Sequence, residues 1–377
     1  MDDLKGYLQA QLSPMTDLLS ELVNIESQTR DKSGVDRIGQ VIARHLSGLG
    51  AEIKTFPQAS HGDHIVGVLN QGKGEPIVLI LHMDTVHPAG TLALRPVRIE
   101  EGLFYGPGSY DMKASHVIAL FALEALLKVG EFPSREVRML FTSDEETHSQ
   151  TSRELIENVS RDCILAMVME PALADGRLKS SRKGVGEFRV TAHGRATHAG
   201  AEHRQGINAI EELAHQVLRL QAFTDYKRGV TLSVGAIRGG SVTNEVPDWA
   251  TLLVDTRVST VEDASKISDL IYGLQPVLHG ATLEVEGAFY RPPMECNSQR
   301  LATFEQVQRI GRGIGLELGH GPSGGGSDAS FTAYLGVPTL DGFGAVGDGA
   351  HAVHEHIVLS SLPERSALCA AVLRDYK

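Results

Sequence analysis

The chain has 377 residues, of which 42% are hydrophobic and 22% charged, and its formal net charge is −12. This length can build a large buried core and favours two domains over one. The negative charge and the aromatic content of only 5% argue against nucleic-acid binding. The most apolar segment, VIALFALEALL, is too short to span a membrane. We therefore expect a small-molecule or peptide substrate.

The cysteines and the N-terminal sequence indicate in which cellular compartment the protein is expected. Cys163, Cys296 and Cys369 are far apart and form no CxxC pattern, which favours a reducing environment over disulfides or a thiolate metal site. The N-terminal MDDLKGYLQAQLSPM lacks the basic start and apolar run of a secretory signal. A cytoplasmic location is expected.

Strands and helices alternate in the first half of the chain. A helix is predicted between Gly34 and Gly50, followed by the strands HIVGVLN and PIVLILH. A helix from about Ala114 to Val129, the strand EVRMLFT, a helix near residues 152–158 and the strand CILAMVME come next. This order predicts an α/β fold with a mixed, mainly parallel sheet between helices.

The pattern changes from about Gly184. The order becomes strand, helix, strand, strand, helix, strand, which predicts a ferredoxin-like α+β domain with four strands and helices on one side. We expect this inserted domain at residues 181–290, with residues 1–180 and 291–377 forming one discontinuous domain. The second part of that domain is predicted to contain two helices, at about 298–314 and 362–376, with the strand VPTLDGF between them.

Polar side chains follow the predicted strands, where open α/β sheets bind ligands. In LILHMDTVH, His82 and Asp84 are two residues apart and point the same way in an extended chain. Asp84 could accept the proton of one imidazole nitrogen while the other nitrogen binds a metal. The alternative is a polar turn without a ligand. His87, a few residues on, is interpreted as incidental.

Carboxylates recur at three further places. In YGPGSYDMKAS, Asp111 could bridge two cations or cap the following helix. In SDEETHS, Glu146 could bind a metal while Glu145 faces a water molecule, or both could belong to an exposed acidic turn. MVMEPA ends another strand with Glu170. Burying these groups together would be unfavourable unless a cation lies among them.

The segment GDGAHAVHEHI near the C-terminus supplies His351, His354 and His356 with Glu355, and the glycine-flanked His351 is favoured as a ligand. A His, Asp and Glu set without thiolate suits zinc, with cobalt or manganese as substitutes. Two metals that share Asp111 and a hydroxide would polarise a carbonyl, generate a nucleophile and stabilise a tetrahedral oxygen.

The inserted domain and the segment after it contribute further polar candidates. These are His198 in GRATHAG, Asn244 in SVTNEVP, Arg257 in VDTRV, Arg291 in FYRPP, and the glycine-rich PSGGGSDAS. Arginine suits carboxylate recognition, and a glycine-rich backbone can present N–H groups to an anion. The alternatives are a structural histidine, surface salt bridges for the arginines and a tight turn for the glycines.

The ordered motifs HMDTV, GPGSYDMKAS, SDEETHS, MEPA, GRATHAG, GGGSDAS and GAHAVHE resemble those of a dinuclear zinc amidohydrolase and metallopeptidase family. This family contains carboxypeptidase G (the glutamate carboxypeptidases), succinyl-diaminopimelate desuccinylase, acetylornithine deacetylase and aminoacylase. SDEETHSQTSRELI and SVTNEVP look most like the glutamate carboxypeptidase branch. Ala114 and Ser115 replace the Gly-Gly of many members, and the HAVHE form is not diagnostic of that branch.

The resemblance implies a zinc-peptidase catalytic domain that holds two Zn²⁺ per subunit. One ion would be bound by His82 and Glu170 and the other by Glu146 and His351, with Asp111 bridging them.

The resemblance also implies roles in catalysis and in substrate binding. Asp84 would orient His82, and Glu145 would act as general base and then as general acid. His198 would stabilise the tetrahedral oxyanion across a homodimer formed by the inserted domain. The substrate-binding residues it implies are Asn244 and Arg257 from that domain, and Arg291, Gly325, Gly326 and Ser327 near the carboxylate of the substrate.

The activity that we expect is metal-dependent hydrolysis of an amide bond, through a metal-bridging hydroxide. It would release a C-terminal amino acid, glutamate or aspartate, from an N-acyl or peptidyl conjugate. One alternative is a deacylase of another small N-acyl amino acid, diamine or nonpeptide amide. The other is a noncatalytic binding protein, which predicts missing ligands.

Overall fold

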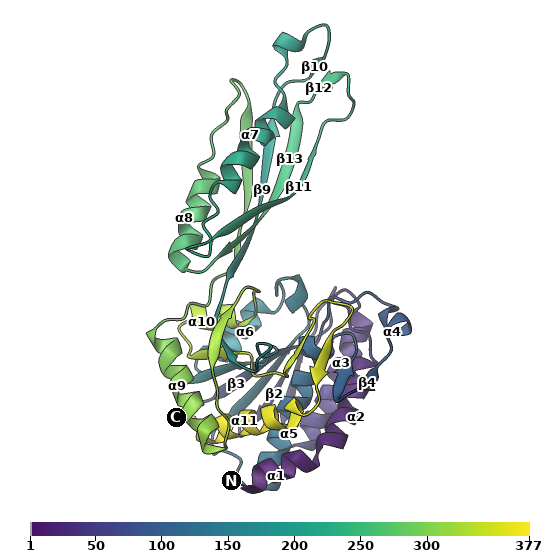
Figure 1. Cartoon of the computed structure of the whole chain (residues 1–377), viewed down its shortest axis with the longest axis vertical. Coiled ribbons are helices and arrows are strands. Elements are labelled where there is room, and N and C mark those ends of the chain that lie inside the picture. The colour runs from purple at the N-terminus through teal and green to yellow at the C-terminus, as the bar shows by residue number, and fades with distance from the viewer. Residues whose placement is uncertain (1) are drawn as a thin grey trace. The chain divides into compact units, whose positions relative to one another are not determined.

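Two separate hydrophobic cores organise the chain in a computed structural model that describes residues 2–377 (Figure 1). The first unit contains the chain up to Ser181 together with Cys296–Ser323 and Ser327–Lys377. The second unit contains Arg182–Glu295 and Gly324–Gly326. Among the helices of residues 2–377, none is both long and apolar enough to cross a membrane.

A mixed β-sheet forms the centre of the first unit. In sheet order its strands are β1 (Glu52–Phe56), β2 (His64–Leu69), β6 (Val137–Thr142), β3 (Ile77–His82), β7 (Leu165–Val168), β16 (Thr339–Asp341), β8 (Leu178–Arg182) and β15 (His320–Ser323). The central strands β6, β3, β7 and β16 are parallel to one another. Strand β1 pairs antiparallel with β2, β2 with β6, and β8 with β16. The predicted mixed sheet is confirmed.

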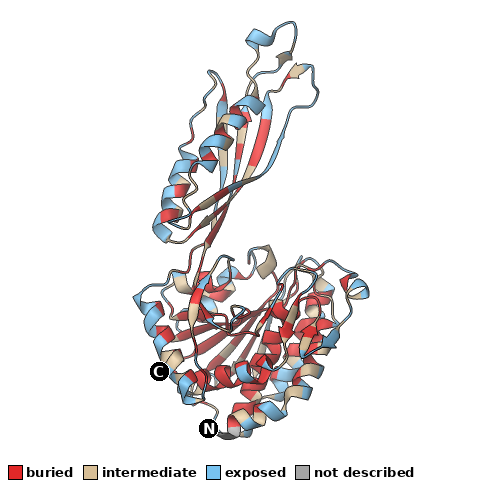
Figure 2. Ribbon diagram, in the orientation of Figure 1, coloured by how far each residue is buried: buried red, intermediate tan, exposed pale blue. Residues whose placement is uncertain are grey.

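Helices cover the sheet and explain its composition. They are α1 (Asp2–Ala10), α2 (Leu12–Val23), α3 (Lys32–Gly48), α4 (Thr91–Leu94), α5 (Ala114–Lys128), α6 (Arg153–Ser160), α9 (Ser298–Gly313), α10 (Ala329–Tyr334) and α11 (Ser361–Asp375). Every residue of β3 is buried, as expected for an apolar strand without alternation that is covered on both faces. Figure 2 shows the same burial across the sheet and along α5 and α11, which pack on each other.

A small sheet brings two distant segments of the first unit together. Its strands, in order, are β17 (Gly347–Asp348), β18 (His356–Val358), β5 (Leu103–Tyr105) and β4 (Arg98–Glu100). Strand β18 pairs antiparallel with β5, so that His356 lies opposite Tyr105. The HAVHEH segment therefore runs beside the loop that leads to Asp111. This small sheet, together with α1 and α2, has no counterpart among the elements predicted from the sequence.

The second unit has the predicted ferredoxin-like order. Its elements are β9 (Gly184–His193), α7 (Ala209–Gln221), β11 (Thr231–Gly239), β13 (Trp249–Val258), α8 (Val261–Tyr272) and β14 (Thr282–Arg291). The sheet order is β11, β13, β9, β14, with antiparallel neighbours. Alternate residues such as Phe188, Val190 and Leu252 are buried with Leu213 and Ile271 of the helices in one core. Successive side chains of a strand point to opposite faces of the sheet, and each helix has one apolar face. The apolar faces of the sheet and of the helices therefore pack into one layer.

A short two-stranded sheet in this unit positions two of the predicted site residues. Strand β10 (Thr197–His198) pairs antiparallel with β12 (Glu245–Val246). Asn244 immediately precedes β12, and its carbonyl oxygen accepts a hydrogen bond from the N–H of Ala199. His198 and Asn244, which are far apart in the sequence, therefore lie next to each other.

Candidate metal centre and active site

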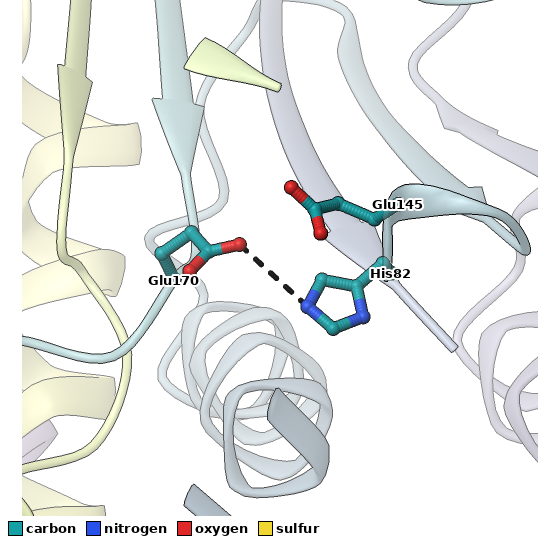
Figure 3. Close-up of side chains that lie close together, drawn as sticks. All are labelled: His82, Glu145 and Glu170. Carbon is teal, nitrogen blue, oxygen red and sulfur yellow. Dashed lines mark ion pairs between the residues drawn. The ribbon is translucent and has the colours of Figure 1, made fainter. Parts of the chain in front are cut away.

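Three neighbouring parallel strands direct acidic and imidazole side chains to the same edge of the sheet. Strand β3 ends at His82, β6 leads into the turn that contains Glu145, and β7 leads to Glu170. Figure 3 shows these three side chains converging, with Nε2 of His82 3.6 Å from Oε1 of Glu170. Because the carboxyl ends of parallel strands meet at one edge, the local sequence pattern is enough to bring these groups together.

Asp111 lies between two histidines. Its Oδ1 is 3.1 Å from Nε2 of His82, and its Oδ2 is 3.3 Å from Nε2 of His351. Nε2 of His351 is also 3.2 Å from Oε2 of Glu146. Helix α5 begins after Lys113 without a side-chain cap, so Asp111 does not cap it. The carboxylate of Asp111 therefore has one oxygen on each side of a divided cluster.

Asp84 is buried behind the cluster and fixes the turn that carries the paired glutamates. Its carboxylate accepts hydrogen bonds from the N–H groups of Glu145 and Glu146, at 3.3 and 3.2 Å, and from the hydroxyl of Thr29 at 2.7 Å. The atom of Asp84 nearest to Nδ1 of His82 is its carbonyl oxygen at 2.9 Å, while the carboxylate is 3.6 Å away. Asp84 thus contacts both the imidazole and the turn.

The electrostatics of the cluster favour positive charge. Burial raises the pKa of Glu146 to about 8, with nearby Asp111 and Glu145 adding to the effect. Hydrogen bonds with Asp111 and Glu146 raise the pKa of His351 to about 11. Burial disfavours the charged form of Asp111, but hydrogen bonds from His351 and His82 outweigh it and hold its pKa below the usual range. Glu146 therefore tends to keep its proton, while His351 is held in its charged form beside the carboxylate of Asp111.

The donor atoms lie close enough together to hold a cation. Two groups of potential ligand atoms each lie within 4.8 Å of one another: His82, Glu145 and Glu170, and His82, Asp111 and Glu146. Oε1 of Glu146 is buried and has no hydrogen-bond partner among the residues that the structure describes. A buried carboxylate oxygen without a donor is unfavourable unless a cation supplies the missing interaction. These observations fit a site for hard or borderline divalent metals.

Two predicted site residues lie at the two-stranded sheet of β10 and β12 in the second unit. Nδ1 of His198 accepts hydrogen bonds from the N–H groups of Gly200 and Ala201, both at 3.1 Å. This geometry leaves the proton on Nε2, where the exposed imidazole can donate it. The neighbouring Asn244 is exposed as well. The imidazole of His198 therefore has a fixed tautomer and presents its Nε2–H as a hydrogen-bond donor.

The other predicted binding residues have defined local partners. Arg257 makes two contacts with the carboxylate of Asp255, at 2.9 and 2.8 Å, which is the salt bridge considered above as its alternative role. Arg291 is buried, and Gly326 lies against its side chain, so a Cβ there would come 3.2 Å from Cδ of Arg291.

The rest of the glycine-rich segment also has local partners. Arg182 approaches the carbonyl oxygens of Gly325 and Gly326 at 3.4 and 3.3 Å. The hydroxyl of Ser327 donates to Asp341 at 2.7 Å.

Several residues around the cluster were not anticipated from the sequence. His116 is buried and its Nε2 is 2.8 Å from the carbonyl oxygen of His82, and burial lowers the pKa of His116 to about 3. His87, interpreted as incidental, is instead buried and contacts Glu355. Thr29 reaches Asp84 from a segment with no distinguishing pattern. Of these residues, Glu355 alone had a signal, as the acid between His354 and His356 in a histidine-rich segment.

The chain matches a family model and known proteins over most of its length. Residues 78–375 match the model described as peptidase family M20/M25/M40. Carboxypeptidase G2 of Pseudomonas sp. (strain RS-16) is 30% identical over 364 residues, which cover 95% of this chain and 88% of that protein. Succinyl-diaminopimelate desuccinylase of Alkalilimnicola ehrlichii is 26% identical. The match covers 96% of this chain and 99% of that protein.

The structural comparison agrees with the sequence match. The crystal structure of a tripeptidase from Staphylococcus aureus has a TM-score of 0.80 at 22% identity and covers 96% of this chain and 98% of its own. At this identity the likeness concerns the fold, and the family assignment rests on the family model and on carboxypeptidase G2. The chain therefore belongs to the peptidase family M20/M25/M40, a family of metal-dependent hydrolases of peptides and related amides.

Proposed function

We propose that this protein is a dinuclear zinc hydrolase that cuts an amide bond and releases a C-terminal amino acid, glutamate or aspartate, from an N-acyl or peptidyl conjugate. The observation that carries the proposal is the position of Asp111, with one oxygen facing His82 and the other facing His351. A carboxylate placed between two separate pairs of ligands is the arrangement that a two-metal site needs.

The proposed ligands fall into two sets around Asp111. His82 and Glu170 would hold one Zn²⁺, Glu146 and His351 would hold the other, and Asp111 would contribute an oxygen to each. Zinc in such a set polarises an amide carbonyl and lowers the pKa of water, which is the chemistry that amide hydrolysis at neutral pH requires. Co²⁺ and Mn²⁺ accept the same nitrogen and oxygen donors and are expected to substitute.

Glu145 is proposed as the group that moves the proton. Its backbone is fixed by Asp84, and its carboxylate lies beside His82 and Glu170. As the oxygen of the attacking water bonds to the carbonyl carbon, the carboxylate of Glu145 takes a proton from that water. It returns the proton to the amide nitrogen as the carbon–nitrogen bond breaks, so that a neutral amine leaves.

The second unit is proposed to complete the site in a homodimer. His198, with its proton on Nε2, would donate a hydrogen bond to the tetrahedral oxyanion from a second copy of the chain. Asn244 and Arg257 would contact substrate from the same unit. The location proposed is the cytoplasm, which the three free cysteines support because a reducing compartment keeps thiols unpaired.

Recognition of a free carboxylate on the substrate is proposed for Arg291 and for Gly325, Gly326 and Ser327. The close contact between Gly326 and the side chain of Arg291 supports this grouping. Guanidinium groups bind carboxylates through paired hydrogen bonds. The similarity to carboxypeptidase G2 favours a glutamate leaving group, and the similarity to the desuccinylase keeps a deacylase of small N-acyl compounds as the second candidate.

A substrate panel tests this assignment. With zinc, cobalt and manganese supplied separately, kcat/KM is expected to be at least about tenfold higher for N-acylglutamate and N-acylaspartate than for N-acyl-leucine or N-acyl-lysine. The reason is that a leaving group with a second carboxylate offers one more charge-assisted contact, worth about 1.5–3 kcal/mol. Higher kcat/KM on N-acetylornithine or N-succinyl-diaminopimelate would replace the proposal by the deacylase. Absence of hydrolysis with every metal would favour a binding protein.

Metal removal is expected to lower stability as well as activity. A ligand present at 100 times its Kd stabilises the native state by about 2.7 kcal/mol. For a unit of this size that corresponds to a fall in Tm of roughly 5–10 °C after chelation. Calorimetry before and after treatment with a chelator measures the shift, and added zinc should reverse it. An unchanged Tm together with unchanged activity would exclude a structural or catalytic metal.

A further inference from the structure

We propose that Glu355 is a positioning residue that fixes the loop of Asp111 and ties it to the segment of His351. The inference rests on the proposed function, because it takes Asp111 and His351 to be metal ligands. It concerns a residue that does not itself face the cluster: Glu355 is 2% exposed and its carboxylate is directed at the backbone of the Asp111 loop.

Four hydrogen bonds hold the carboxylate of Glu355. Oε1 accepts from the N–H groups of Tyr110 and Asp111, at 2.9 and 3.0 Å. Oε2 accepts from the N–H of Gly108 at 2.7 Å and lies 2.6 Å from Nε2 of His87. Both oxygens therefore have two donors, and three of the four donors belong to the backbone that carries Asp111. Hydrogen bonds to an ionised acceptor are stronger than neutral ones, so this loop is firmly held.

The loop is shaped for this contact. Gly108 has a φ of +71°, and a Cβ at this position would come 2.6 Å from Cγ2 of Thr85. The conformation turns the N–H groups of residues 108, 110 and 111 toward one side, where Glu355 accepts all three. A residue other than glycine would meet both the unfavourable φ and the close contact.

His87 and Arg95 continue the network outward. A guanidinium of Arg95 donates to Nδ1 of His87 at 3.2 Å, and because arginine has no acceptor, Nδ1 must be the unprotonated nitrogen. The proton of His87 is therefore on Nε2, which donates it to Glu355. Arg95 also donates to the carbonyl oxygen of Ala352 at 3.0 Å, next to His351.

These contacts couple the two halves of the proposed metal site. His351 and Glu355 belong to one short segment, and that segment is attached to the Asp111 loop by Glu355 and to the preceding loop by Arg95. The two oxygens of Asp111 can face His82 and His351 together only while the loop and the segment keep their relative position. Substitution of residues that orient metal ligands costs 10–100-fold in affinity or activity in other metal sites.

The test is zinc binding by the Glu355→Gln variant, measured by competition with a chromophoric chelator. Glutamine has the same shape, but its NH2 group would face two N–H donors on whichever side it is placed. We expect the affinity of the folded protein for zinc to fall about 10–100-fold. kcat should fall by a similar factor with KM changed less than about threefold, and excess zinc should restore part of kcat.

Glu212→Gln is the matched control. Glu212 is also a fully buried carboxylate that accepts backbone N–H groups, from Val277 and Leu278, but it lies in the second unit. Its substitution should lower Tm without changing zinc affinity. A merely structural role for Glu355 predicts the same behaviour for Glu355→Gln, namely a lower Tm with normal zinc affinity, and that result overturns the inference.

His87 provides a second variant in case Glu355→Gln does not fold. His87→Ala removes one donor to Glu355 and should weaken zinc binding several-fold, while His87→Gln, which can supply an N–H to Glu355, should restore most of it. Equal zinc affinity in His87→Ala and the wild type overturns the inference. If Asp111→Asn also leaves zinc affinity unchanged, the proposed ligand set itself is wrong, whereas a loss confined to Asp111→Asn rejects only the role of Glu355.

Discussion

Replacing Glu145 by glutamine is expected to lower kcat by about 10²–10⁴-fold, the usual contribution of a general acid and base. The amide keeps the size of the side chain but cannot accept a proton from water or return one to the leaving nitrogen. Its backbone hydrogen bond to Asp84 does not involve the side chain and should persist, so the turn should keep its shape. KM should change little. Steady-state kinetics and the number of metal ions per chain are the measurements.

The metal content of Glu145→Gln separates two roles for this side chain. A carboxylate oxygen of Glu145 lies within 4.8 Å of donor atoms of His82 and Glu170, so its position alone suits a ligand as well as a base. Full metal content with low kcat identifies a base, whereas loss of one metal would identify a ligand. Glu157→Gln on α6, which removes an exposed contact with Arg153, is the control and should change neither quantity. Full activity of Glu145→Gln would reject both roles.

Much of the fold and the cluster of acids could be predicted because both depend on local patterns. The unbroken apolar run of β3 indicates a strand covered on both faces, and its first polar residue, His82, marks the end of that strand. The same holds for Glu170 after β7, so parallel neighbours bring the two side chains to one edge. In the second half of β13 buried residues alternate with partly buried ones, as in a sheet with helices on one face.

The contacts that position the cluster could not be predicted because they join segments that are far apart in the sequence. Glu355 and Gly108 are separated by 247 residues, and Asp84 and Thr29 by 55. No periodicity relates such pairs, and their approach depends on the completed sheet and on the small sheet of β5 and β18. For the same reason His87, which looks like any polar residue after a strand, could not be recognised as a partner of Glu355.

Replacing Asp111 by asparagine should impair both proposed metal sites at once, since Asp111 has one oxygen toward His82 and the other toward His351. The amide lacks the negative charge and keeps only one good acceptor. Residues that only orient metal ligands contribute up to about 100-fold in affinity, so the loss of a ligand itself should lower the zinc affinity of each site by at least that factor. Activity should fall with it, because in the proposed mechanism the bound zinc would activate the same water molecule from which Glu145 would take a proton. Metal analysis after dialysis against defined free zinc measures the loss.

Single-site variants make the Asp111 prediction specific. Glu170→Gln should weaken only the metal proposed at His82, and His351→Ala only the metal proposed at Glu146, so each should retain about one ion where Asp111→Asn retains none. Asp263→Asn, which alters a buried carboxylate at the start of α8 in the second unit, should retain both. If Asp111→Asn lost a single ion and kept the other at normal affinity, Asp111 would be a terminal ligand and the bridging arrangement would have to be abandoned.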